Sequence, residues 1–356
     1  MKNKQNKDIK SDCELVFQKV SGKLKKLSGS TLLITGGTGF FGSWVSELVF
    51  YMNENHKMNV RLYLVGRDFE DFKSNLPHLV ESENIKFIRS DIRHLTEIPS
   101  EVNYIIHAAN NPDNRFHSSR PLESMTTVAE GIGAVVKSSS LAQNLLKIVN
   151  ISSSSVYSMG KDCDKNFIES DQGYAFNKEI QNCFGEANRY GECLCHAARN
   201  ELRLPIINVR PFTFCGAYQS IDSPWAINNF INDAINKRPI SIFGDGNTVR
   251  SYMYGADLAA WLIIIMLYSE DGKTYNIGNG TGFSLREIAE KVSSFFQPSP
   301  SILLNTSLTT QSNNTLLLPD ISKAEKDFGL AQYTDIDRSI KRTVAWHEEN
   351  LNFVYK

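Results

Sequence analysis

The chain has 356 residues, 41% of them hydrophobic and 22% charged, which is typical of a soluble globular protein with one large or two ordinary domains. Its formal net charge of −1 excludes a global electrostatic attraction to nucleic acid or to an anionic membrane. The longest apolar run, residues 261–268, is too short to span a bilayer. The six cysteines are scattered without a zinc-type spacing, so we expect free thiols, no metal site and a cytoplasmic protein.

Residues 1–29 are predicted to form a tail and a leading helix. The tail, residues 1–10, is expected to be disordered, and apolar residues recur at helical spacing between residues 12 and 27. Short strands rich in Val, Ile and Leu then alternate with helices. This pattern predicts an α/β fold with a Rossmann-type, doubly wound parallel sheet over residues 30–212. The looser pattern over residues 213–356 predicts a smaller mixed α/β lobe with some return to the sheet. The predicted strands are 31–35, 60–66, 85–91, 102–109, 145–154 and 204–212.

The strongest local motif is "TLLITGGTGFFG", in which a buried strand runs into three glycines and a helix follows. Gly36 permits a tight turn, Gly39 lets the backbone approach a pyrophosphate, and Gly42 allows the helix to pack closely on the strand. The helix N-terminus supplies N–H groups and a positive dipole for the phosphates. The motif therefore predicts a bound dinucleotide, and the alternative is a glycine-rich turn without a ligand. The residues of this turn assigned to the cofactor are Gly36, Thr38, Gly39, Phe40, Phe41 and Gly42.

The second predicted strand ends in "VGRD", where Arg67 precedes Asp68. An acidic residue at this point favours the ribose of NAD, whereas an arginine pairs with the 2′-phosphate of NADP or stacks on adenine. The sequence therefore favours NADP slightly over NAD. The alternative is that Arg67 is only a solvated surface charge.

A series of further segments resembles the extended short-chain dehydrogenase/reductase family, in its branch of nucleotide-sugar epimerases and dehydratases (NAD-dependent epimerase/dehydratases). The segments occur in family order over nearly the whole chain. They are "TGGTGFFG" (35–42), "SDIR" (90–93), "HAAN" (107–110), "ISSSSVY" (151–157), "NVRPFTFCGAY" (208–218), "FGDGNTVRSYMYGADLA" (243–259), "YNIGNGTGFSLREIAEKV" (275–292) and "LPDISKAEKDFG" (318–329).

The resemblance implies a nucleoside-diphosphate sugar as substrate, a homodimer formed through the catalytic helix and its predecessor, and a role in making surface glycans. Residues 213–356 would mainly hold the nucleotide sugar. Ser153 would hydrogen-bond the substrate oxygen and Arg250 would hold the diphosphate. The further cofactor residues that it implies are Asp91, Ile92, Ala108, Ala109, Asn110, Asn188 and Pro211, and the further substrate residues are Ser154, His117, Asn228 and Asn229, the last two with helix packing as an alternative role.

Members of this family normally carry Tyr-x-x-x-Lys on the catalytic helix, and three registers are open here. Aligned backwards from "NVRPF", the family pattern places Phe184 at the tyrosine position and Asn188 at the lysine position, and we favour this register. The segment "YAFNK" keeps both residue types at Tyr174 and Lys178, but precedes the expected helix. The third, "YGECL", starts at Tyr190, which points roughly 240° around the helix from Phe184.

The serine motif narrows the reaction that the resemblance implies. Dehydrating members carry Asp and Glu at the two positions after the catalytic serine, and decarboxylating members carry a Glu, whereas this chain has Ser154 and Ser155. We therefore expect C4 oxidoreduction, as an epimerase or 4-keto reductase. The alternatives are a 4,6-dehydratase with non-standard acids, or a silent or mutationally trapped binding protein. If the protein is active, its proton comes from Ser153, a water, Tyr174 or His117.

Overall fold

The computed structural model describes residues 4–157, 166–173, 180–305 and 316–350. At its centre lies a parallel sheet of seven strands in the order β11-β6-β5-β4-β1-β2-β3. From β3 to β6 this is the doubly wound order of a dinucleotide-binding fold, so the predicted fold class is confirmed. In chain order the strands are β1 (Thr31–Thr35), β2 (Arg61–Gly66), β3 (Ile85–Arg89), β4 (Tyr104–His107), β5 (Lys147–Ile151), β6 (Ile206–Pro211) and β11 (Thr274–Ile277).

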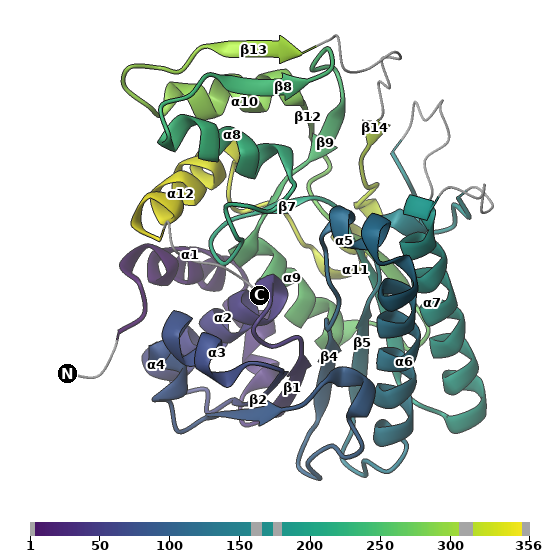
Figure 1. Ribbon diagram of the computed structural model, residues 1–356. Helices are drawn as coiled ribbons and strands as arrows, with labels where there is room; N and C mark the ends of the chain where they lie inside the picture. The colour runs from purple at the N-terminus through teal and green to yellow at the C-terminus, as the bar shows by residue number, and fades with distance from the viewer. Residues whose placement is uncertain (1–3, 158–165, 174–179, 306–315, 351–356) are drawn as a thin grey trace.

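Helices cover both faces of this sheet (Figure 1). One face is covered by α2 (Phe40–His56) and α9 (Gly255–Tyr268), and the other by α6 (Pro121–Ser139) and α7 (Cys183–Leu202). Helix α9 is buried on all sides except at its last residue, because it lies among the sheet, α2 and the N-terminal helix. Its apolar run is therefore core, as the sequence predicts.

The leading helix, α1, begins earlier than expected, at Lys7, and ends at Leu24. The expected disordered tail over residues 1–10 is therefore wrong for Lys7 and the residues after it. Asn6 is the physical reason, because its side-chain oxygen accepts hydrogen bonds from the backbone N–H groups of Asp8 and Ile9 and so caps the helix. The apolar side of α1 packs on α2 and α9.

The C-terminal part adds small sheets and helices beyond the carboxyl ends of the main strands (Figure 1). This is the end of the sheet at which α5 (Asn114–Ser119) follows β4. The boundary at residue 212 stays a prediction, since β11 from this part joins the main sheet beside β6. The small strands are β7 (Phe214–Cys215), β8 (Ile240–Phe243), β9 (Val249–Ser251), β10 (Met253–Tyr254), β12 (Gly282–Ser284), β13 (Ile302–Asn305) and β14 (Leu316–Leu317). The remaining helices are α3 (Phe69–Asn75), α4 (Pro77–Val80), α8 (Ala226–Ile235), α10 (Leu285–Ser294), α11 (Ser322–Phe328) and α12 (Ile336–Glu349), with short 3₁₀ turns η1 (Lys25–Leu27), η2 (Ile92–His94), η3 (Ser154–Tyr157) and η4 (Ile180–Asn182).

A bilayer would need a longer apolar helix than any found in the described ranges.

Candidate functional site

The predicted cofactor and serine residues share one edge of the main sheet. All seven strands are parallel, so their carboxyl ends lie together, and the strand order reverses between β1 and β4, which is where such sheets bind ligands. The predicted residues at this edge are Gly36, Thr38, Gly39, Phe40, Phe41 and Gly42 after β1, Arg67 after β2, Asp91 and Ile92 after β3, Ala108, Ala109 and Asn110 after β4, Ser153 and Ser154 after β5, and Pro211 at the end of β6.

The glycine turn has the backbone that a dinucleotide pyrophosphate needs. Gly36 has φ +66°, and a Cβ there would lie 2.6 Å from the carbonyl oxygen of Ala108. A Cβ at Gly42 would contact the carbonyl oxygen of Gly37, so only glycine lets α2 start this close to the strand. Gly39 is the N-cap of α2, and no side chain caps that first turn. Its N–H groups are therefore available to phosphate oxygens, and the cradle fits the cofactor.

Next to this cradle, the ends of β2 and β3 present charged groups. The Arg93 side chain donates to both oxygens of Asp91 and, despite partial burial, lowers the pKa of that carboxyl to about 2. Asp91 is therefore an anion that can accept a hydrogen bond from an adenine amino group. Arg67 is exposed, whereas the side chain of Asp68 caps α3. The exposed guanidinium, rather than that carboxylate, is thus free to meet a ribose substituent.

Asn188 lies in a small cleft between α7 and the ends of β4 and β5, with Ala109, Asn110 and Ile151. Only 2% of its surface is exposed, and its amide donates a 2.8 Å hydrogen bond to the carbonyl of Phe184 in the preceding turn. The favoured register therefore puts an amide, without positive charge, where the family pattern has a lysine.

Two asparagines in the same sheet region were missed from the sequence. Asn150 in β5 lines this cleft, and its amide donates to the side-chain oxygen of Asn208 in β6 at 2.9 Å. A polar residue inside the apolar run "KIVNI" was the signal that could have identified Asn150. His107, at the end of β4, makes a structural hydrogen bond, with 2.7 Å between its Nδ1 and the Thr35 hydroxyl.

Phe184 stacks face to face on His117, with ring centroids 3.8 Å apart and planes 14° apart. Nδ1 of His117 lies 2.8 Å from the hydroxyl of Ser124 in α6, and only 3% of His117 is exposed. Burial lowers the pKa of His117 to about 4, so the ring is neutral at pH 7. Ser124 was missed because nothing in its sequence context distinguishes it.

The serine turn lies directly against the start of α7. A Cβ at Gly185 would lie 2.6 Å from the carbonyl oxygen of Ser155, so glycine permits this close approach. The half-buried Ser153 hydroxyl accepts a 3.1 Å hydrogen bond from the backbone N–H of Ser155. Ser153 is therefore positioned by its own turn, next to the first turn of α7 that carries Phe184.

Other predicted residues lie apart from this group. Asn228 is fully buried in α8, and its amide donates to the carbonyl of Ser220 at 2.8 Å, which supports a structural role, while Asn229 next to it is half-buried. Arg250 in β9 donates to the carbonyl of Val249 at 2.8 Å, beyond the carboxyl edge of the main sheet. Tyr174, the alternative acid or base, lies outside the described residues.

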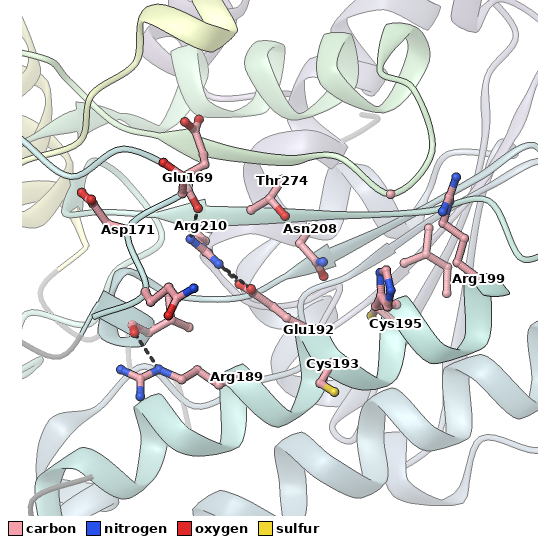
Figure 2. Close-up of a pocket in the computed structure, with 16 residues that line it drawn as sticks. Glu169, Asp171, Arg189, Glu192, Cys193, Cys195, Arg199, Asn208, Arg210 and Thr274 are labelled. Carbon is pink, nitrogen blue, oxygen red and sulfur yellow. Dashed lines mark hydrogen bonds and ion pairs between the residues drawn. The ribbon is translucent and has the colours of Figure 1, made fainter. Parts of the chain in front are cut away.

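A second cavity, of about 370 Å³, lies between α7 and the last two strands of the sheet, β6 and β11 (Figure 2). Arg210 and Glu192 cross it as a bidentate ion pair with nitrogen–oxygen distances of 2.8 and 2.7 Å. Arg210 also donates to the Tyr157 hydroxyl and the Glu169 carbonyl, both at 3.0 Å. These contacts hold α7 on the sheet, so we assign this cavity a structural role.

Comparison with known proteins identifies the family of the chain. The model of the family described as "NAD dependent epimerase/dehydratase family" matches residues 32–278. UDP-glucuronic acid decarboxylase 3 of Arabidopsis thaliana is 29% identical over 299 residues, which are 84% of this chain and 83% of that protein. UDP-glucuronic acid decarboxylase 2 of the same plant is 25% identical, and the match covers 85% of this chain but only 65% of that protein's length.

Solved structures show the same fold. An epimerase from Methanothermobacter thermautotrophicus superposes with a TM-score of 0.80 at 22% identity, over 94% of this chain and 97% of its own. The UDP-glucuronic acid 4-epimerase of Bacillus cereus, in complex with UDP-glucuronic acid and NAD, superposes with a TM-score of 0.74 at 22% identity, over 90% and 99%. With its family match, its sheet order and its glycine turn, the chain belongs to the NAD-dependent epimerase/dehydratase family.

Proposed function

We propose that the protein catalyses oxidation or reduction at C4 of a nucleoside-diphosphate sugar, as an epimerase or a 4-keto reductase. The observation that carries this proposal is the serine turn. Ser153 stands at the carboxyl edge beside the dinucleotide cradle, and the next two residues are Ser154 and Ser155. Neither hydroxyl is a useful acid or base at neutral pH, so chemistry that needs only a bound oxygen and one transferred proton fits best.

The same turn argues against decarboxylation of UDP-glucuronic acid, the activity for which the relatives described above are named. Their sequences are 24–29% identical to this chain, but the resemblance gives decarboxylating members a glutamate in the turn that carries Ser154 and Ser155 here. The carbon skeleton of the sugar would therefore stay intact. A 4,6-dehydratase remains the alternative only if it recruits acids from elsewhere.

We propose a uridine diphosphate sugar as the substrate. The relatives are named for UDP-glucuronic acid, and an enzyme of the same fold from Bordetella bronchiseptica is described with NAD and UDP. Arg250 would contact the diphosphate, and Ser153 would hydrogen-bond the C4 oxygen. A bound nicotinamide dinucleotide supplies the hydride acceptor, and the glycine turn, Asp91 and Asn188 would hold it.

The family is NAD-dependent, and neighbouring structures contain NAD. We keep a slight preference for NADP as a proposal, because Arg67 is exposed at the end of β2 while the Asp68 carboxylate caps α3. A 2′-phosphate would find a cation there, whereas one oxygen of the neighbouring carboxylate is already engaged by the first turn of α3.

We also propose a cytoplasmic homodimer that works in surface glycan synthesis. Helices α6 and α7 pack side by side on one face of the sheet and carry exposed apolar residues, including Leu122 (76% exposed) and Tyr190 (53%). A second copy would cover these side chains in a bundle of four helices. Light scattering of wild-type protein and of Tyr190→Glu tests this, because only the wild type should be a dimer.

A catalytically silent protein is the second candidate, and the Phe184 and Asn188 pair is the observation that favours it. The experiment that separates the two incubates the protein with NAD or NADP and a panel of nucleotide sugars. Absorbance of the reduced nicotinamide and chromatography of the sugar product are followed. Product or cofactor reduction supports C4 chemistry, whereas tight binding of both ligands without either change supports the silent protein.

A further inference from the structure

We propose that His117 is the catalytic residue that exchanges a proton with the C4 oxygen of the sugar, in place of the tyrosine hydroxyl that this chain lacks. The inference rests on the proposed function, because it assigns the proton step of that reaction to a residue of this chain.

The geometry places the imidazole against the ring whose hydroxyl is missing. Phe184 occupies the tyrosine position in the favoured register, and the imidazole of His117 stacks on its phenyl ring with centroids 3.8 Å apart. Every atom of the imidazole therefore lies within a few ångströms of the phenyl carbon that would carry a hydroxyl. The serine turn packs against the neighbouring Gly185, so Ser153 belongs to the same corner of the protein.

One ring nitrogen of His117 is already engaged and the other is not. Nδ1 lies 2.8 Å from the Ser124 hydroxyl, whereas Nε2 is buried without a hydrogen-bond partner among the described residues. An orphaned nitrogen costs stability, since a buried polar atom normally finds a partner. A substrate hydroxyl would supply that partner. If Ser124 accepts the Nδ1 proton, Nε2 carries the lone pair and can act as a base.

The surroundings keep the ring neutral. Burial is the main reason that the pKa of His117 is lowered to about 4, and Asp113 on the same short helix opposes it weakly because Arg115 is paired with that carboxylate. The groups that α6 and α7 present to the ring are Ser124 and Phe184, neither of which is charged. The imidazole is therefore in the neutral form, which is the form that can accept a proton, at pH 7.

The step balances with the dinucleotide as the redox partner. The O4–H bond breaks and its proton goes to Nε2, while the C4–H bond breaks and its electron pair leaves as hydride to the oxidised nicotinamide. C4 and O4 become a carbonyl group, and the sugar is oxidised by two electrons as the nicotinamide is reduced. In the reverse step the imidazolium returns its proton to O4.

The test compares His117→Gln with His347→Gln in the full-length protein. His347 in α12 is the matched control, because it is equally buried (1% exposed), has both ring nitrogens unpartnered among the described residues, and has a pKa lowered to about 4. We expect His117→Gln to lower kcat by about 100-fold or more with little change in KM, and His347→Gln to keep wild-type kcat. A second readout needs no turnover. On adding UDP-glucuronic acid, the ¹⁵N chemical shift of His117 Nε2 should move, and that of His347 should not.

An epistasis experiment guards against a merely structural effect. In the background Phe184→Tyr with Asn188→Lys, a tyrosine can carry the proton. His117→Gln should therefore lower kcat less than tenfold in that background. An active wild type with unchanged kcat in His117→Gln and an unmoved Nε2 resonance would overturn the role of His117 while leaving the proposed function intact. A wild type that binds the nucleotide sugar but converts no member of the panel overturns both.

Discussion

The side-chain amide of Asn188 donates its hydrogen bond back to the carbonyl of Phe184, one turn earlier in α7. A lysine at this position would instead extend a positive charge toward the cofactor ribose and lower the pKa of a neighbouring tyrosine. Here one N–H of the amide is used inside the helix, and the Asn188 side chain brings no positive charge to the cleft that it lines. The helix therefore keeps its shape while both functions of the usual pair are missing.

Restoring that pair tests the register. Phe184→Tyr with Asn188→Lys should raise kcat about 10- to 100-fold, because a positioned acid–base group typically contributes 10²–10⁴-fold and His117 already supplies part of it. Steady-state kinetics with UDP-glucuronic acid measures the change. The single Phe184→Tyr variant should gain less, since without the lysine its hydroxyl keeps a pKa near 10. No gain in any activity would contradict the register.

A methyl group at Gly36 should abolish dinucleotide binding. The added Cβ would lie 2.6 Å from the Ala108 carbonyl oxygen, at a φ of +66° that alanine avoids. Isothermal titration of Gly36→Ala with NAD and NADP should show at least a 100-fold weaker affinity. Gly22→Ala is the control, because Gly22 is exposed in α1 with no atom within 4 Å of an added Cβ. It should bind normally and gain roughly 0.5–1 kcal/mol of stability.

The proposed preference for NADP over NAD depends on Arg67. Arg67→Ala should weaken NADP binding about tenfold and leave NAD binding within twofold, because only NADP carries the 2′-phosphate. The measurement is the ratio of the two dissociation constants at fixed ionic strength. Arg61→Ala, at the exposed start of the same strand, is the control and should leave this ratio unchanged. Equal losses for NAD and NADP would show that Arg67 stacks on the adenine instead.

The N-terminal helix is joined to the C-terminal helix through a buried carboxylate. Asp12 (1% exposed) accepts hydrogen bonds from the Tyr254 hydroxyl at 2.7 Å, Arg338 at 2.8 Å and Arg342 at 3.2 Å. Asp12→Ala should cost about 1–3 kcal/mol, since it removes one acceptor from three donors and leaves the buried Tyr254 hydroxyl without it. Asp8→Ala removes another partner of Arg342, but one whose side chain is 46% exposed, and should cost less than about 1 kcal/mol. Urea unfolding compares the two.

Stability should fall in mild acid. Burial lowers the pKa of His107, His117 and His347 from 6.5 to about 4, so between these values the unfolded chain binds three more protons than the native one. Their stabilising contribution is complete above pH 6.5 and is lost as the pH falls toward 4. Asp257 has the opposite effect, because burial raises its pKa to about 7 and the native chain then holds one proton that the unfolded chain has lost. Between pH 6.5 and 4 the unfolded chain should therefore bind about two more protons than the native chain, and the free energy of unfolding should fall as the pH is lowered. His347→Gln should reduce this difference by one proton.

Most of the sheet could be predicted from the sequence because its strands are short apolar runs between helices. All six predicted strands exist, and all but the first are shorter than predicted. The largest differences are at 102–109 and 145–154, where β4 is Tyr104–His107 and β5 is Lys147–Ile151. The residues that follow them turn away from the ladder to form the site. The small strands such as β7 and β10 carry too few residues for a periodic pattern and are set by pairing between distant segments.

The site residues likewise divide into those that a local motif predicts and those that only tertiary packing brings together. The glycine turn is a contiguous motif, so Gly36 and Gly42 could be assigned from local geometry. The stack of His117 on Phe184 joins two helices through tertiary packing, and no spacing in the sequence encodes it. The hydrogen bond between Nδ1 of His117 and the Ser124 hydroxyl spans only seven residues, but it joins α5 to α6 across the break between these helices. Sequence reasoning could name His117 as one source of a proton among four, and the structure distinguishes it by its unpartnered nitrogen.

Strand β11 has a consequence for how the chain is made. It lies at the edge of the main sheet beside β6, yet it is synthesised after α8, α9 and the small strands β7 to β10. Until Thr274–Ile277 emerge from the ribosome, β6 presents an unpaired edge to solvent, and until α9 is complete the face that it covers is bare. A fragment ending at residue 212 should therefore aggregate rather than yield a separate cofactor domain. The nascent protein depends on its last third to seal the sheet that its first two thirds begin.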